Sequence, residues 1–151
     1  MIKHFPQNMW EFAQTSDILF GNRREYKTLI NNVGLTLSVE NFVKNLCQNY
    51  KNQKNTACGK IVIVTNGQDY VMCAHSGGTV EVLDVPKIDK NRFKDSNGAG
   101  DAFAAGFLAG LLFQKEPLTS MKWGCWVAQQ IIQQQGCTIP HYSADILKEI
   151  H

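Results

Sequence analysis

The sequence lacks a strong excess of charge of either sign. Its 151 residues include 15 lysines and arginines against 13 acidic residues, which gives a formal net charge of +2 at neutral pH. A protein that binds nucleic acid or a membrane surface through a basic face carries a larger imbalance. We therefore expect neither nucleic acid nor a membrane among its partners. The share of hydrophobic residues, 44%, is ordinary for a soluble globular domain with its own core.

The cysteines lack the close pairing that is typical of metal sites. They number five, an odd count, none stands in a C-x-x-C arrangement, and the four histidines are equally dispersed. We therefore expect reduced thiols in an apolar core rather than disulfides or a structural zinc site. The cysteines are Cys47, Cys58, Cys73, Cys125 and Cys137.

Long hydrophobic runs are also missing. The longest apolar stretch without charge extends from Ala102 to Phe113, well short of the roughly 20 residues that cross a bilayer. The first residues lack the apolar segment of a signal peptide, so we expect a cytoplasmic protein. Gly106 and Gly110 form a G-x-x-x-G pair, which predicts close packing of a helix on a sheet rather than dimerisation in a membrane.

The elements that are present predict an alternation of strands and helices. Continuous apolar runs at Asp17–Phe20 and Ile61–Thr65 predict buried parallel strands, and Tyr70–Ala74 with Thr79–Val85 predicts a hairpin. The polar segment Lys51–Lys60 is typical of a surface loop. Helices are expected over Pro6–Thr15, Arg23–Ile30, from Ser38 as N-cap through Leu46, after Gly98 as a buried helix, from about Leu118 to Gln135, and in a short tail over 144–150.

A glycine-rich run gives the strongest indication of chemistry. It reads Asp95-Ser96-Asn97-Gly98-Ala99-Gly100-Asp101 and leads directly into the long apolar stretch. Glycine and alanine let backbone N–H groups converge on one point, because no large side chain screens them. At a helix N-terminus those groups form a place for an anion. An acid beside such a place indicates phosphoryl transfer to a hydroxyl group, although a glycine turn before a helix is often only a packing device.

Two common phosphate-binding motifs do not fit this run. No Gly-Lys-Ser/Thr follows it, so it is not a Walker A loop, and Phe103 stands where a dinucleotide fingerprint would have its third glycine. The basic residues before the run, from Lys87 to Lys94, favour a solvated loop over a role facing phosphate by about two to one.

Residues 95–103 resemble the second signature of the ribokinase-like (PfkB) family, in its adenosine kinase form. Four further segments resemble the same family in the expected order: Asp17–Glu25 with its N-x-x-E motif, Ile61–Gly67 ending in T-x-G, Pro117–Thr119, and Gly136–Pro140. The resemblance implies a ribokinase-like three-layer α/β/α fold with a mainly parallel sheet. It also implies a kinase that uses ATP and Mg²⁺, with adenosine as the expected acceptor.

The resemblance also implies roles for particular residues. Asp101 would be the general base, and Gly98, Ala99 and Gly100 would supply the anion hole for the transferring phosphoryl group. Asn97, together with Ala99, would border the base of ATP.

Further roles fall outside the glycine-rich run. Asn22 and Glu25 would organise magnesium through water, whereas taken without the resemblance they are an N-cap and a first-turn acid. Thr65 and Gly67 would approach the ATP phosphates, although Asn66-Gly67 is also adequately explained as a turn. Cys125 would lie beside the nucleotide base.

Two substitutions depart from the adenosine kinase pattern. Ser96 replaces the usual threonine and keeps the hydroxyl group, and Cys125 stands where such kinases commonly carry a histidine. The chain resembles only the C-terminal half of the family, so we expect residues 1–151 to be a single ATP-binding and catalytic domain that lacks the acceptor-binding N-terminal half and the lid. The alternatives are another PfkB sugar kinase and a non-catalytic fragment that binds a nucleotide or a partner.

Overall fold

The computed structural model describes residues 6–50, 59–75 and 77–136. Two compact units make up the chain, Met1–Val82 and Leu83–His151. That these units form a single domain stays a prediction. The expected tail helix over 144–150 lies outside the described residues, as do Cys58 and Cys137.

The predicted helices and strands within the described residues are confirmed, with ends that differ by a few residues. β4 begins in the first unit and ends in the second. In chain order the elements are α1 (Pro6–Thr15), β1 (Ile18–Asn22), α2 (Arg23–Asn32), α3 (Val39–Gln48), β2 (Ile61–Asn66), β3 (Tyr70–His75), β4 (Thr79–Asp84), the 3₁₀ turn η1 (Lys90–Arg92), α4 (Ala99–Leu112) and α5 (Pro117–Ile132).

The described sheet is mixed, with strand order β1-β2-β3-β4. β1 and β2 are parallel and place Asn22 beside Thr65, whereas β2 and β3 are antiparallel. The expectation of a mainly parallel sheet is therefore corrected for this part of the chain. The cause lies in the connections: α2 and α3 supply the long crossover that parallel strands need, while the tight turn at Gly67 can join only antiparallel neighbours.

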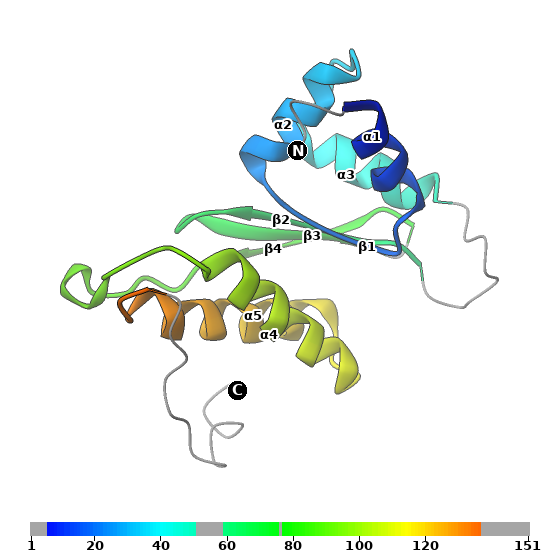
Figure 1. Ribbon diagram of the computed structural model, residues 1–151. Coiled ribbons are helices and arrows are strands. Elements are labelled where there is room, and N and C mark those ends of the chain that lie inside the picture. Colours follow the sequence, from blue (N-terminus) through cyan, green and yellow to red (C-terminus); the bar gives the residue numbers. More distant parts are fainter. Residues whose placement is uncertain (1–5, 51–58, 76, 137–151) are drawn as a thin grey trace. The chain divides into compact units, whose positions relative to one another are not determined.

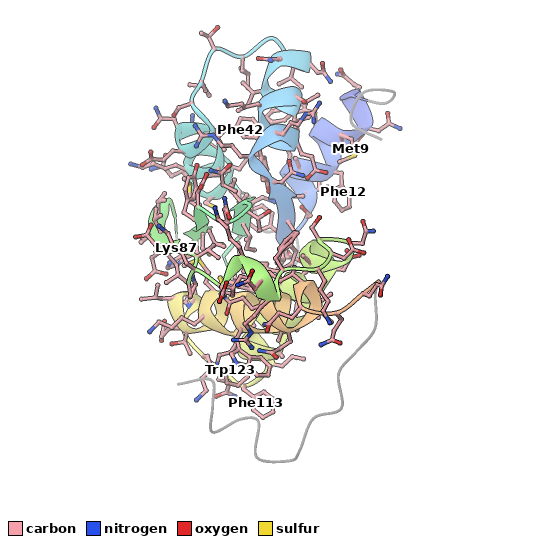
Figure 2. All side chains as sticks on the ribbon, turned by 90° about the vertical axis from the view of Figure 1, so that its left-hand side faces the viewer. Met9, Phe12, Phe42, Lys87, Phe113 and Trp123 are labelled. Atoms are coloured by element: carbon pink, nitrogen blue, oxygen red, sulfur yellow. The ribbon has the colours of Figure 1, made fainter. Side chains whose placement is uncertain are left out.

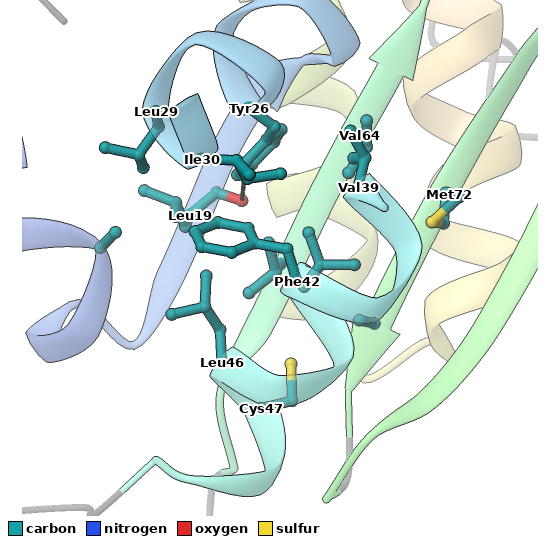
Figure 3. Packing of buried hydrophobic residues seen from close by; sticks show 14 residues of the cluster. Leu19, Tyr26, Leu29, Ile30, Val39, Phe42, Leu46, Cys47, Val64 and Met72 are labelled. Atoms are coloured by element: carbon teal, nitrogen blue, oxygen red, sulfur yellow. Dashed lines mark hydrogen bonds between the residues drawn. The ribbon is translucent and has the colours of Figure 1, made fainter. Parts of the chain in front are cut away.

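The core of the first unit lies between one face of the sheet and the helices α1, α2 and α3 (Figure 1). Phe42 is 1% exposed, and its ring centroid lies 5.8 Å from that of Trp10 and 6.4 Å from that of Tyr26. Burying one such side chain contributes roughly 1.5–3 kcal/mol to folding. Figure 3 shows the buried cluster, which comprises Ala13, Leu19, Tyr26, Leu29, Ile30, Val39, Phe42, Val43, Leu46, Cys47, Val62, Val64, Met72 and Ala74.

The side chain of Tyr26 in α2 contacts both strands of the parallel pair β1 and β2. Its buried hydroxyl group lies 3.4 Å from the carbonyl oxygen of Leu19 in β1 and 3.2 Å from that of Ile63 in β2. Burial raises the pKa of the phenol well above its usual range, so the hydroxyl stays a proton donor. A Cβ at Gly21 would lie 2.9 Å from the tyrosine ring. The ring can therefore pack across the end of β1 only because residue 21 has no side chain.

The prediction of a surface loop over Lys51–Lys60 is wrong at Lys60, which is buried. Residues 51–58 are outside the described part of the chain, but Lys60 is 1% exposed. Its ammonium group donates to the Ser16 carbonyl oxygen and lies 4.8 Å from the ring centroid of Tyr50. Desolvation lowers the pKa of this lysine. A buried cation needs such partners, and they come from segments distant in the sequence.

Glycines let α4 and α5 pack closely in the second unit. A Cβ at Gly106 would lie 2.8 Å from the Trp123 carbonyl oxygen, one at Gly110 would lie 2.6 Å from Ser120 Oγ, and one at Gly124 would lie 2.6 Å from the Phe103 ring. The G-x-x-x-G pair was expected to pack on a sheet. Its observed partner is instead a helix with its own small residues spaced four apart, Ser120 and Gly124, because two such rows let helix backbones approach.

The helix α4 was expected to be buried, and the structure buries one face of it. Phe103, Gly106, Phe107 and Gly110 form that face, whereas Leu112 is 84% exposed. Beyond the helix end, the Phe113 ring lies 5.7 Å from that of Trp123 (Figure 2).

Gly106→Ala is expected to destabilise the chain. The added methyl group meets backbone atoms of α5 that cannot rotate away, and overpacking of this kind costs roughly 1–3 kcal/mol. Gly100→Ala is the matched control, because a Cβ there meets nothing within 4 Å and is expected to gain about 0.4–1 kcal/mol. Urea unfolding followed by circular dichroism measures both. A Gly106→Ala chain as stable as the wild type would contradict the close packing.

Candidate active site

Gly98 stands at the start of α4, within the glycine-rich run. It is the N-cap of the helix, with φ +77° in the left-handed region that favours glycine. No side chain caps this helix end. The first bond of the helix runs from Ala102 N–H to the Gly98 carbonyl oxygen at 2.9 Å, so the N–H groups of Gly100 and Asp101 have no acceptor within the helix. These two donors at the positive helix end are suited to an anion.

Backbone hydrogen bonds fix the segment that precedes Gly98. The N–H groups of Lys94 and Asp95 donate to the Ile132 carbonyl oxygen at the end of α5, at 2.9 and 3.3 Å. The Asp95 carboxylate then accepts from the backbone and side-chain N–H groups of Asn97, at 2.9 and 3.2 Å. Hydrogen bonds therefore hold the start of the loop, at Lys94 and Asp95, against the end of α5. The other end of the loop continues into α4, which packs on α5.

Asp101 stands in the first turn of α4 and is exposed. Asp101 follows Gly100 directly, in the same helical turn as the two N–H groups without helical acceptors. Neighbouring Gly100 has open space around it, so a ligand can approach the backbone there. This arrangement can hold an anion and accept a proton from a group bound beside it.

Asn22 and Glu25 form a complete capping box at the start of α2. The Asn22 side-chain oxygen accepts from Glu25 N–H at 2.9 Å, and Glu25 Oε2 accepts from Asn22 N–H at 2.8 Å. The interpretation as an N-cap and first-turn acid is therefore confirmed. Both side chains are exposed. The capping box uses one of the two carboxylate oxygens of Glu25, so a role toward magnesium-bound water stays a prediction alongside it.

Thr65 and Gly67 lie at the end of β2, beside the capping box. Thr65 is the register partner of Asn22, and Gly67 has φ +59° in the turn to β3. Asn66 donates to the Asp69 carboxylate at 3.0 Å across this turn. The interpretation of Asn66-Gly67 as a turn is confirmed, and the approach of Thr65 and Gly67 to phosphates stays a prediction.

The structure gathers the predicted residues into one group within each unit. The first unit brings together Asn22, Glu25, Thr65 and Gly67, and the second contains the run Asn97–Asp101. Cys125 is buried in α5, where burial raises the pKa of its thiol to about 11, so it is a neutral thiol at physiological pH. Its contact with a nucleotide base stays a prediction.

One contact at the edge of the first group was not predicted from the sequence. Arg23 in α2 donates to the Tyr70 hydroxyl group in β3, and its guanidinium carbon lies 5.9 Å from the tyrosine ring centroid. No local pattern signals this contact, because the two residues are 47 positions apart.

Magnesium fits the first group only as an ion held through water and phosphate. Among the described residues, no group of three or more His, Cys, Asp or Glu side chains could hold a metal ion. Mg²⁺ keeps several of its waters and binds through one or two carboxylates plus substrate phosphates. Glu25 has one carboxylate oxygen outside the capping box, so the donor set matches that mode of binding.

As to membranes, no helix in the described ranges is long and apolar enough to cross one.

Comparison with known proteins shows that the chain belongs to the pfkB family of carbohydrate kinases. The family model matches residues 2–144. Adenosine kinase 2 of Arabidopsis thaliana is 32% identical over 131 residues, which cover 86% of this chain and 37% of that protein. The adenosine kinase of Saccharomyces cerevisiae is 39% identical over 87 residues, which cover 58% of this chain and 25% of that protein. This chain therefore spans about two-fifths or less of these curated relatives.

A solved structure supports the same family and fold. The structure of Anopheles gambiae adenosine kinase in complex with P1,P4-di(adenosine-5) tetraphosphate is 33% identical, with a TM-score of 0.77. The match covers 93% of this chain and 42% of that one. The predicted resemblance and the ribokinase-like α/β fold are both confirmed.

Asn22→Ala is expected to lower the free energy of unfolding by about 1 kcal/mol, because Glu25 N–H loses its acceptor. Asn22→Asp keeps an oxygen in place and should retain most of that stability. Ser38→Ala serves as a comparison, because it removes the N-cap hydrogen bond of α3, in which the Ser38 hydroxyl oxygen accepts from Asn41 N–H at 3.1 Å. Urea midpoints compare the three variants. An Asn22→Ala midpoint equal to the wild type would show that the cap contributes nothing.

Proposed function

We propose that the chain is the ATP-binding and catalytic part of an adenosine kinase, a transferase of purine salvage. The intact enzyme phosphorylates the adenosine 5′-hydroxyl group with ATP and Mg²⁺ and yields AMP. The observation that carries the proposal is the start of α4. No side chain caps it, the N–H groups of Gly100 and Asp101 have no acceptor within the helix, and the acid Asp101 stands in the same turn. Support for adenosine as the acceptor comes from relatives described as adenosine kinases.

Asp101 would act as the general base in this reaction. Its carboxylate takes the proton from the 5′-hydroxyl group as that oxygen attacks the γ-phosphorus of ATP. The bond from the γ-phosphorus to the bridging oxygen breaks, and ADP leaves. An exposed carboxylate in a first helical turn suits this role, because it needs to accept a proton only as charge develops on the attacking oxygen.

The loop would stabilise the transferring phosphoryl group. The backbone N–H groups of Gly98, Ala99 and Gly100 present fixed dipoles. Gly100 N–H has no acceptor within the helix, whereas Ala99 N–H also donates to the Ser96 carbonyl oxygen at 3.2 Å. Dipoles that are already oriented meet growing negative charge without reorganisation. Asn97 and Ala99 would border the adenine of ATP, with Cys125 as a neighbour. The two hydrogen bonds to Ile132 keep the loop in place throughout.

Residues of the first unit would serve the triphosphate. Asn22 and Glu25 would orient magnesium-bound water while they keep the capping box, and Thr65 and Gly67 would face the phosphates. Bound Mg²⁺ would neutralise part of the negative charge of the triphosphate.

The acceptor-binding half of the kinase would be a further partner of this chain. Because the chain covers 37% of Adenosine kinase 2, a second candidate function is ATP binding without turnover. Calorimetric titration with ATP and an assay for ATP-dependent AMP formation separate the two. Binding without turnover by the 151-residue chain favours the second candidate, whereas absence of ATP binding contradicts both.

Asp101→Asn tests the base in a complete, active kinase that contains this chain. Removal of a general base is expected to lower kcat by roughly 10²- to 10⁴-fold. ATP affinity should stay within a few-fold, because the amide is similar in size and the loop backbone is unchanged. Asp89→Asn is a control, since its exposed carboxylate caps η1 by accepting from Asn91 N–H. Near-normal turnover of Asp101→Asn would remove Asp101 from the mechanism.

A further inference from the structure

The contact between Arg23 and Tyr70 lies at the edge of the sheet that the proposed function assigns to phosphates. Arg23 is the first residue of α2 and directly follows Asn22, the register partner of Thr65. Tyr70 is the first residue of β3 and pairs with Asn66. Open α/β sheets bind ligands beyond the carboxyl ends of their parallel strands, and β1 and β2 end at this edge.

The arginine side chain reaches over the end of β2. Strand order places β2 between β1 and β3, and neighbouring strands lie about 4.8 Å apart, so a contact from the end of β1 to the start of β3 spans roughly 10 Å. The guanidinium group donates through Nη1 to the Tyr70 hydroxyl and packs near the ring. It is therefore held at the end of the strand that carries Thr65.

The guanidinium group of Arg23 has more N–H donors than its bond to Tyr70 uses. A guanidinium has five N–H donors, and the bond to Tyr70 uses one nitrogen. Among the described residues, no carboxylate lies within salt-bridge distance of Arg23. The salt bridge in this part of the chain joins His75 and Glu81 instead. A half-buried arginine that is fixed by a phenol, and whose charge is paired with no acid of the described residues, is suited to binding phosphate oxygens.

We propose that Arg23 is a phosphate-binding residue for the triphosphate of ATP, and that Tyr70 is a positioning residue that holds its guanidinium in place. This assignment rests on the proposed function, because it takes ATP as the ligand. It adds a cation of this chain to the edge where Thr65 and Gly67 are expected to meet the phosphates. Tyr70 acts only through Arg23.

Calorimetric titration of the 151-residue chain with ATP tests the assignment. Arg23→Ala should weaken ATP binding about tenfold, which corresponds to one lost charge-assisted hydrogen bond. Its affinity should also depend less steeply on salt, because one screened ionic contact is gone. Arg24→Ala is the matched control: it removes the same charge from the neighbouring exposed position and should bind ATP as the wild type does.

A double-mutant cycle tests the role of Tyr70. Tyr70→Phe keeps the ring and removes the hydroxyl acceptor, and we expect a smaller loss, about threefold, within the range of one neutral hydrogen bond. In the Arg23→Ala background the same change should add nothing, because coupled residues are not additive. Arg23→Lys keeps the charge without the planar fork and should recover part of the affinity. It also provides the comparison if Arg23→Ala does not fold, as judged by circular dichroism.

The outcomes separate this assignment from the proposed function. A wild-type chain that binds no ATP overturns both. A wild-type chain that binds ATP, with Arg23→Ala and Arg23→Lys equal to it in affinity and salt dependence, overturns only the role of Arg23. Equal losses in Arg23→Ala and Arg24→Ala would show a general charge effect and overturn it as well. An additive loss from Tyr70→Phe in the Arg23→Ala background would remove Tyr70 as a positioning residue.

Discussion

The close approach of α4 and α5 is the constraint on which the geometry of the glycine loop depends. A Cβ at Gly106, Gly110 or Gly124 would meet the facing helix at less than 3 Å, so the helices can approach this closely only with glycine at these positions. At its start, the loop is hydrogen-bonded to Ile132, the last residue of α5, and at its end it continues into the first turn of α4. Both of its ends are therefore fixed to the same pair of helices. Preorganised N–H dipoles stabilise a phosphoryl group only if they hold their position, and here the helix pair provides that rigidity.

In the first unit, the motif that caps α2 also carries the residues proposed to serve the triphosphate. Asn22 and Glu25 cap α2 through two reciprocal hydrogen bonds, and the parallel pairing of β1 with β2 brings them beside Thr65. The hydroxyl group of Tyr26 reaches both strands from the same helix. Each contact that builds the start of α2 thus also fixes the position of side chains at the carboxyl edge of the sheet. A structural role for the N-x-x-E motif therefore does not argue against a role toward phosphate.

Local signals made much of this architecture predictable, and contacts between distant residues set the limit. The N-cap at Ser38, the strand at Ile61–Thr65 and the glycine start of α4 follow from short-range patterns. The partner of the G-x-x-x-G pair was predicted wrongly, because helix and sheet surfaces make the same demand for small residues. The burial of Lys60 and the contact of Arg23 with Tyr70 depend on which segments the fold brings together. Local sequence patterns do not indicate which distant residues will come into contact.

The most direct test of the central claim is an NMR titration of the ¹⁵N-labelled chain with ATP. The account predicts that the backbone N–H signals of Gly98, Ala99, Gly100 and Asp101 shift most within the second unit, because phosphate oxygens bind at those donors. Signals from the exposed end of α4 near Leu112 serve as the internal reference. ATP binding that leaves the four loop signals unmoved would contradict the claim that this loop holds the phosphoryl group.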